Sequence, residues 1–126
     1  MALRLSDKAR HTVAGELPPD TLSFLLEHGV PESVVLAGFE HNFNLDLEPL
    51  LDRGVFRLGT VDLRWCSQQI VVQRTTGHFG YVCHEEAVPL WEFCNTSVAN
   101  FLKCCEVCDL MWELQKQNQI AYEARA

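Results

Sequence analysis

The chain has 126 residues, and its 17 acidic against 10 basic side chains give a formal net charge of −7 at pH 7. With 48% hydrophobic residues, a chain of this length can form one packed core, which excludes wholesale disorder. The acidic balance argues against binding to nucleic acid or anionic membranes, because both depend on Lys and Arg. It leaves open a domain that meets a basic partner.

The N-terminal segment and the lengths of the apolar runs indicate the cellular compartment of the protein. Residues 1–8 reach a charged side chain at Arg4 and contain no apolar core, so we expect no signal peptide. No apolar run approaches the roughly 20 residues that cross a bilayer. These features predict a cytoplasmic protein whose six cysteines are reduced thiols.

The first predicted element is a short helix with both ends marked. Pro19 and Asp20 suit a helix start, where missing N–H groups and negative charge are tolerated. Leucines at helical spacing follow, and Gly29 and Pro31 then end the pattern. We predict a helix from Pro19 to His28.

The next segment, Glu40 to Asn44, is polar and lies between apolar runs, so we predict a loop. His41 within it could take part in acid–base chemistry, but no nucleophile or second motif is linked to it. We expect an ordinary solvated residue.

The middle of the chain changes to the alternation of half-buried strands. Because Pro89 cannot donate to a β-ladder, the segment around it can only be an edge strand or an extended link. The middle of the chain as a whole predicts an antiparallel meander. Its strands are expected at 55–58, 61–65, 70–72 and 79–84, with a tight turn at 74–77 and the edge segment at 88–91.

The last predicted element is a helix that begins at one of the capping residues 95–97 and runs to about Gln117. Its apolar positions step by three and four, so we expect one buried stripe. The stripe consists of Phe101, Cys104, Cys105, Cys108, Met111 and Trp112. Together the elements predict a single α+β domain.

Cys104, Cys105 and Cys108 are the obvious candidates for a metal site. Zinc prefers four ligands, usually as two separated pairs, and the sequence contains no second CxxC or HxxxH pair. Packing in the core explains the three thiols more simply, with metal binding and redox chemistry as the alternatives. His78 and His84 would lie roughly 20 Å apart on one strand and cannot share an ion.

No catalytic signature occurs in the sequence. It contains no P-loop, dinucleotide-binding fingerprint, nucleophile elbow or HExxH motif. We therefore predict no catalytic, cofactor-binding or metal-binding residues, and no cofactor.

Acidic residues are concentrated in residues 15–54, which hold eight of them against Arg53 alone. Such a surface can simply keep a protein soluble, or it can attract a basic partner through its long-range field. On the second interpretation, the candidate partner-binding residues are Glu40, Asp46, Glu48, Asp52 and Asp62.

The order of motifs resembles the SUKH superfamily. Residues 17–31 are similar to its opening helix, in which a Leu-Pro start ends in Gly, and residues 56–62 to its F-x-L-G strand entry. Residues 70–82 resemble its central hairpin, and residues 95–102 its N-x-S-x-x-x-F-L helix opening. In particular, the pattern resembles the fourth SUKH immunity-protein family of bacterial polymorphic toxin systems.

This resemblance implies a single SUKH-like domain over residues 1–126, with a recognisable core at about 17–112. It implies an α+β fold in which an N-terminal and a C-terminal helix flank a central antiparallel sheet. It further implies a non-catalytic protein that neutralises a cognate toxin, of nuclease or deaminase type, by binding it. The alternatives are an accessory or regulatory scaffold in a biosynthetic gene cluster and a small Cys/His metal-dependent enzyme. The oligomeric state stays open.

Overall fold

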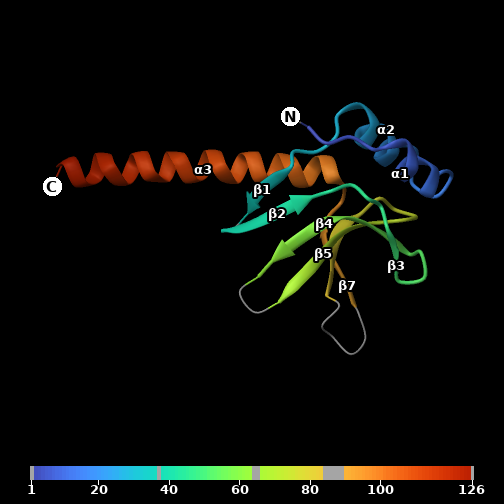
Figure 1. The fold of residues 1–126 in the computed structure, drawn as a ribbon. Helices are drawn as coiled ribbons and strands as arrows, with labels where there is room; N and C mark the ends of the chain where they lie inside the picture. The colour runs from blue at the N-terminus through green and yellow to red at the C-terminus, as the bar shows by residue number, and fades with distance from the viewer. Residues whose placement is uncertain (1, 37, 64–65, 84–89, 126) are drawn as a thin grey trace.

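The computed structural model describes residues 2–36, 38–63, 66–83 and 90–125, and Figure 1 shows the arrangement of the elements. The helices are α1 (Asp7–Thr12), α2 (Pro19–Glu27) and α3 (Val98–Arg125). The strands are β1 (Ser33–Leu36), β2 (Phe39–Phe43), β3 (Pro49–Leu50), β4 (Val55–Asp62), β5 (Ser67–Gln73), β6 (Phe79–Cys83) and β7 (Leu90–Asn95). The predicted α+β class is confirmed, with an antiparallel sheet flanked by N-terminal and C-terminal helices.

The strands form one sheet in the order β1-β2-β4-β5-β6-β7, with the short β3 also paired to β4. Every described pairing is antiparallel, as the meander predicted. β2 and β4 approach closely at Gly59, where a Cβ atom would lie 2.0 Å from the carbonyl oxygen of Asn42. Only glycine can occupy this position without separating the two strands.

The main core lies between the helices and one face of the sheet, which we call the inner face. Phe79 of β6 stacks on Phe101 of α3 with ring centroids 4.1 Å apart, and both side chains are almost fully buried. Leu25 of α2 completes the core from the N-terminal side. A smaller cluster on the other face consists of Val55, Val71 and Val82, with Leu50 and Trp91 packed against it. Alternate residues along the central strands therefore supply two separate apolar layers.

The predicted helix at Pro19–His28 and the strands of the meander match the structure closely. α2 covers Pro19–Glu27, and the segments predicted at 55–58 and 61–65 join into the single strand β4. Gly77 has φ +73° in the predicted turn. β7 is an edge strand of the sheet, as predicted for Leu90–Trp91. Residues 64, 65, 84, 88 and 89 of the predicted strands lie outside the described residues.

The predicted polar loop at Glu40–Asn44 is wrong, because residues 39–43 form β2, which pairs with β1 and β4. His41 and Phe43 point into the core, and Glu40 and Asn42 point outwards. Inward and outward positions alternate along residues 39–43, but the sequence shows this alternation only if His41 is counted as a core residue. His41 is in fact only 3% exposed.

The single buried stripe predicted for the last helix is also wrong. Phe101 and Cys105 are buried, but Cys104 and Cys108 are exposed, and Trp112 is 58% exposed. Cys104 points sideways from buried Cys105, and Cys108 and Trp112 line a hollow beside β1. Figure 1 shows that α3 runs along the sheet only at its start and then continues past it. The helix also extends to Arg125 rather than to about Gln117. Among the described helices, none is long and apolar enough to cross a membrane.

Candidate partner-binding face of the sheet

The sheet face opposite α3, which we call the outer face, carries two of the predicted acidic residues. Along β2 and β4, His41 and Val61 point into the core and are register partners, so Glu40 and Asp62 point outwards on neighbouring strands. Both acidic residues are exposed. Asp62 accepts a 2.5 Å hydrogen bond from the Ser67 hydroxyl. The outer face includes Glu40, Asn42, Arg57, Thr60, Asp62, Gln69, Trp91 and Phe93, and the buried cluster of Val55, Val71 and Val82 lies on the same side.

Arg57 brings two more of the predicted residues to this face. Its Nε donates to Asp46 Oδ2 at 3.0 Å, and its Nη2 lies 2.7 Å from Glu48 Oε2. Nη1 also donates to Gln69 Oε1 at 3.2 Å, which ties the cluster to β5. Hydrogen bonding to Asp46 raises the pKa of Arg57 above its ordinary value. One cation therefore partly neutralises two carboxylates, and the cluster retains one net negative charge.

The segment between β2 and β3 holds these carboxylates outwards in a strained backbone. Leu45 and Leu47 both have φ +51°, although their side chains are buried as anchors. The Asp46 carboxylate accepts the Glu48 N–H at 3.2 Å, and Leu47 N–H donates to the Arg57 carbonyl at 2.9 Å. Left-handed backbone at leucine costs about 1 kcal/mol or more per residue, and such strain is concentrated at functional sites in proteins.

Asp52 lies apart from the other four, in the turn between β3 and β4. Leu51, Asp52 and Arg53 all have positive φ values there, and Asp52 is exposed. Its neighbour Arg53 pairs with Glu16 and donates to the Thr12 carbonyl, so this turn is tied to the α1 region. The structure thus brings four of the five predicted residues to one side of the sheet and leaves Asp52 at its end.

The outer face also presents apolar side chains that the sequence analysis did not single out. Phe93 on the edge strand β7 is 56% exposed, and Trp91 packs on the buried pair Val71 and Val82. Gly80 makes room for the Trp91 ring, which lies 2.6 Å from where a Cβ atom would stand. The alternation in residues 90–95 was the available signal. The outer face therefore combines acidic residues on β2 and β4 with aromatic residues on β7.

The comparisons with known proteins identify the family. The family model described as SUKH-4 immunity protein matches residues 8–125. The chain belongs to the SUKH-4 immunity protein family. No match was found among the curated proteins or among the solved structures. The resemblance drawn from residues 17–31, 56–62, 70–82 and 95–102 is confirmed.

In this SUKH-4 family member, His41 belongs to a buried polar network rather than to a solvated loop. Its Nδ1 lies 3.0 Å from the Phe39 carbonyl, which has no proton, so Nδ1–H is the donor and Nε2 accepts from the Tyr81 hydroxyl at 2.9 Å. Cys94 Sγ in turn donates to the Tyr81 oxygen at 3.7 Å. Burial lowers the pKa of His41 and raises that of Tyr81. No buried side-chain nitrogen or oxygen of the described residues lacks a hydrogen-bond partner, which favours a structural role for this network.

The cysteines of this family member are split between core and surface. Cys105 is 4% exposed, and burial raises the pKa of its thiol to about 11, which makes it a poor nucleophile. The thiol of Cys104 is exposed and accepts a hydrogen bond from Asn95 Nδ2 at 3.5 Å. Among the described residues, no three His, Cys, Asp or Glu side chains are grouped so that they could hold a metal ion.

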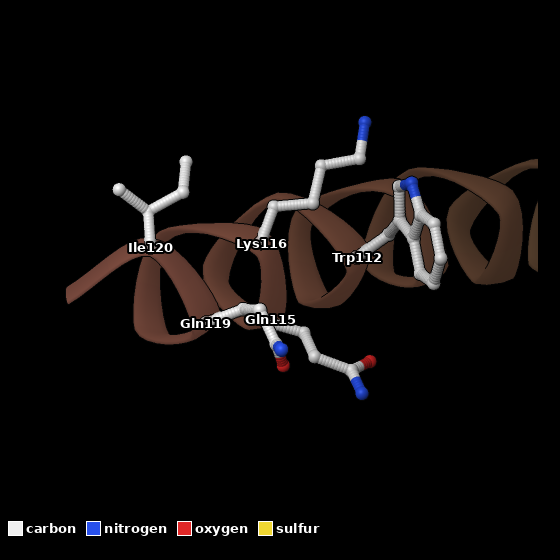
Figure 2. Close-up of a pocket in the computed structure, with 5 residues that line it drawn as sticks. All are labelled: Trp112, Gln115, Lys116, Gln119 and Ile120. Atoms are coloured by element: carbon white, nitrogen blue, oxygen red, sulfur yellow. The ribbon is translucent and has the colours of Figure 1, made fainter. Parts of the chain in front are cut away.

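Hollows in the SUKH-4 domain gather around α3. Two of about 560 and 530 Å³ lie between α3 and β1, and both include Val35 and Asp109 in their lining. Figure 2 shows a third, of about 350 Å³, with Trp112, Lys116 and Ile120 along one side and Gln115 and Gln119 along the other. All five residues belong to α3, so within the described part of the chain no second element closes this hollow. A small-molecule site normally needs enclosure and convergent polar groups, which this hollow lacks.

Proposed function

We propose that this SUKH-4 family member is an immunity protein that neutralises a cognate bacterial toxin by binding to it. The family match over residues 8–125 is the observation that carries the proposal. The toxin is proposed to be a basic nuclease or deaminase, because enzymes that act on nucleic acid need Lys and Arg for the phosphates. The immunity protein itself performs no catalysis and uses no cofactor.

The outer face is the proposed toxin-binding surface. Neither Glu40 nor Asp62 forms an ion pair with a described residue, so their carboxylates can meet Lys or Arg side chains of the toxin. Asp46 and Glu48 already share Arg57, so a toxin cation has to compete for them. We therefore expect Glu40 and Asp62 to contribute more to binding than Asp46 and Glu48, and Asp52 to contribute least.

Phe93 supplies the apolar part of this proposed surface. Aromatic side chains at the centre of an interface carry a large share of its binding energy when neighbouring groups exclude water. Phe93 is 56% exposed and lies on the same face as the acidic residues. Acidic residues would then attract the toxin and set its orientation, and the aromatic edge would slow its release.

The proposed site of action is the bacterial cytoplasm, where a toxin of this kind would meet nucleic acid. The net charge of −7 supports a protein that itself binds neither nucleic acid nor anionic membranes. Its acidic outer face would occupy toxin surfaces that otherwise hold phosphate groups.

Co-expression tests this function directly. The toxin gene adjacent to the gene of this protein is expressed alone, with the wild-type protein, and with a Glu40→Lys, Asp62→Lys double variant. We expect the wild type to restore growth and the double variant to bind purified toxin at least about tenfold more weakly. Glu123→Lys on α3 is the matched control, because it also reverses an exposed acidic residue but lies away from the outer face.

The immunity function and the assignment of the outer face are contradicted by different outcomes. Lack of rescue by soluble wild-type protein would contradict the immunity function. Rescue that survives the double variant with unchanged affinity would leave the function intact and overturn the assignment of the outer face.

A further inference from the structure

α3 carries apolar side chains on two opposite sides. Its inward side packs on the sheet through Val98, Phe101 and Cys105, which are 1–4% exposed. Its other side carries a second series, which we call the outer stripe. The outer stripe consists of Val107, Leu110, Met111, Leu114, Ala121 and Tyr122, and its five large side chains are 55–75% exposed.

Helix geometry places this stripe away from the sheet. Val107 follows Val98 by nine positions, which at about 3.6 residues per turn is two and a half turns, so the two residues lie on opposite sides of α3. Leu110, Met111 and Leu114 follow at spacings of three, four and seven from Val107, which keeps them on one side. α2 lies only beside the start of α3, where Asp20 and Phe24 adjoin Val98. No element of the described chain covers the outer stripe.

The exposed apolar area of the outer stripe is large enough to form the centre of a protein–protein interface. Five large side chains at this exposure leave on the order of 500 Å² of apolar surface in one stripe, near the upper end for a single patch on a monomer. A stable interface takes about 800 Å² from each partner, and the polar residues that flank the stripe along 103–124 supply the remainder. One helix of the same length, laid alongside, is enough to cover it.

We propose that a second copy of this chain packs its α3 antiparallel on the outer stripe, which makes the protein a homodimer. Leu110 in the first half of the stripe and the small Ala121 in the second half lie at equal distances from a point just beyond Leu114. An antiparallel pairing centred at that point sets Leu110 of each copy against Ala121 of the other. A parallel pairing would instead set Leu110 against Leu110 and Ala121 against Ala121.

The antiparallel arrangement also avoids a clash between the two domains. Each sheet packs against the first half of its own α3, on the side opposite the stripe. In the dimer the two sheets therefore lie at opposite ends and on opposite sides of the helix pair. The partner helix ends near the level of residue 106, short of α2. This dimer does not depend on the proposed toxin binding and leaves both outer faces accessible.

Mass measurement on the full chain tests the dimer. Sedimentation equilibrium or light scattering should give about twice the 14.3 kDa chain mass at concentrations up to about 100 μM. Leu110→Glu with Leu114→Glu should give the monomer mass with an unchanged circular dichroism spectrum, because both side chains are exposed in the single chain. Gln119→Glu, an exposed residue of α3 outside the stripe, is the matched control and should stay dimeric.

A compensating pair tests the orientation. Leu110→Ala should raise the dissociation constant of the dimer about tenfold, and addition of Ala121→Leu should restore it, because the new leucine fills the space left in the other copy. A double variant weaker than the single one would overturn the antiparallel pairing.

A wild-type protein that is monomeric throughout the concentration range would overturn the dimer. The dimer would also be overturned if the wild type is monomeric and Leu110→Glu abolishes toxin binding, because the outer stripe would then bind the toxin and not a second copy. Loss of toxin rescue with the dimer intact would contradict only the proposed function.

Discussion

At the scale of single residues, His41 and Arg57 show how one side chain can organise its surroundings. His41 joins β2 to β6 through the Tyr81 hydroxyl at 2.9 Å, and its ring lies 5.4 Å from that of Phe101 on α3. Arg57 gathers Asp46 and Glu48 on the outer face. His41 links two strands in its neutral form, and Arg57 holds two surface carboxylates through its positive charge.

His41 makes the stability of the fold sensitive to acid. Burial lowers its pKa in the folded protein below the ordinary value of about 6.5, so the unfolded chain takes up the proton first. The stabilisation is fully present above about pH 6.5 and is lost as the pH falls towards the folded pKa. Urea unfolding at pH 7, 6 and 5 should show the free energy of unfolding falling in the wild type and falling less in His41→Gln.

His11→Gln is the control for this prediction, because His11 lies exposed on α1. It should retain the wild-type dependence on pH. An identical slope for His41→Gln and the wild type would contradict the assignment of the effect to His41.

At the scale of elements, the connection from β2 to β3 depends on β4 more than on its own sequence. Leu45 and Leu47 are held in left-handed backbone because their side chains are buried and because backbone hydrogen bonds tie the segment to β4. Leu47 N–H donates to the Arg57 carbonyl, and Arg57 N–H donates to the Glu48 carbonyl. The carboxylates of Asp46 and Glu48 point to solvent and converge on Arg57. The strained backbone therefore persists through packing and through one side chain of the neighbouring strand.

Arg57→Ala should loosen this connection without unfolding the sheet. Loss of the hydrogen bonds to Asp46 and Gln69 should lower the free energy of unfolding by about 1–2 kcal/mol, because the pairs are only partly shielded from solvent. Amide hydrogen exchange at residues 44–48 should accelerate more than at β5. Arg74→Ala, at an exposed turn position, is the control and should leave exchange in this segment unchanged. Unchanged exchange at residues 44–48 in Arg57→Ala would contradict the role of Arg57.

At the scale of the whole molecule, the two candidate binding surfaces face in opposite directions. The acidic residues brought together by β2 and β4 face away from α3, and the outer stripe of α3 faces away from the sheet. A protein built in this way can attract one partner by its field and hold a different one by apolar contact. The two surfaces do not compete for the same side chains.

Binding of the proposed basic toxin should therefore depend on salt chiefly through its association rate. The net charge of −7 acts over about a Debye length, which shrinks from about 10 Å at 0.1 M to about 3 Å at 1 M salt. Stopped-flow measurement should show the association rate falling about tenfold across this range while the dissociation rate changes less. An association rate insensitive to salt would contradict attraction by the acidic face.

The sequence by itself determined the elements whose signals are local. Pro19, Asp20 and Gly29 bounded α2, and Ser97 began α3, where its hydroxyl accepts the Asn100 N–H at 3.0 Å. Alternation in residues 55–83 identified the central meander. The order of these motifs also pointed to the SUKH family, since a family pattern is itself a property of the sequence.

The tertiary structure alone decided which residues are covered. β2 was predicted as a loop because His41 becomes a core residue only when Tyr81, forty positions later, supplies its hydrogen bond. Cys104, Cys108 and Trp112 were predicted to share the stripe of buried Phe101, yet they are exposed. Cys104 points about 100° away from its buried neighbour Cys105, and Cys108 and Trp112 line a hollow between α3 and β1 instead of packing on the sheet. Periodicity states which residues share a side of a helix, but burial depends on what another part of the chain places against that side.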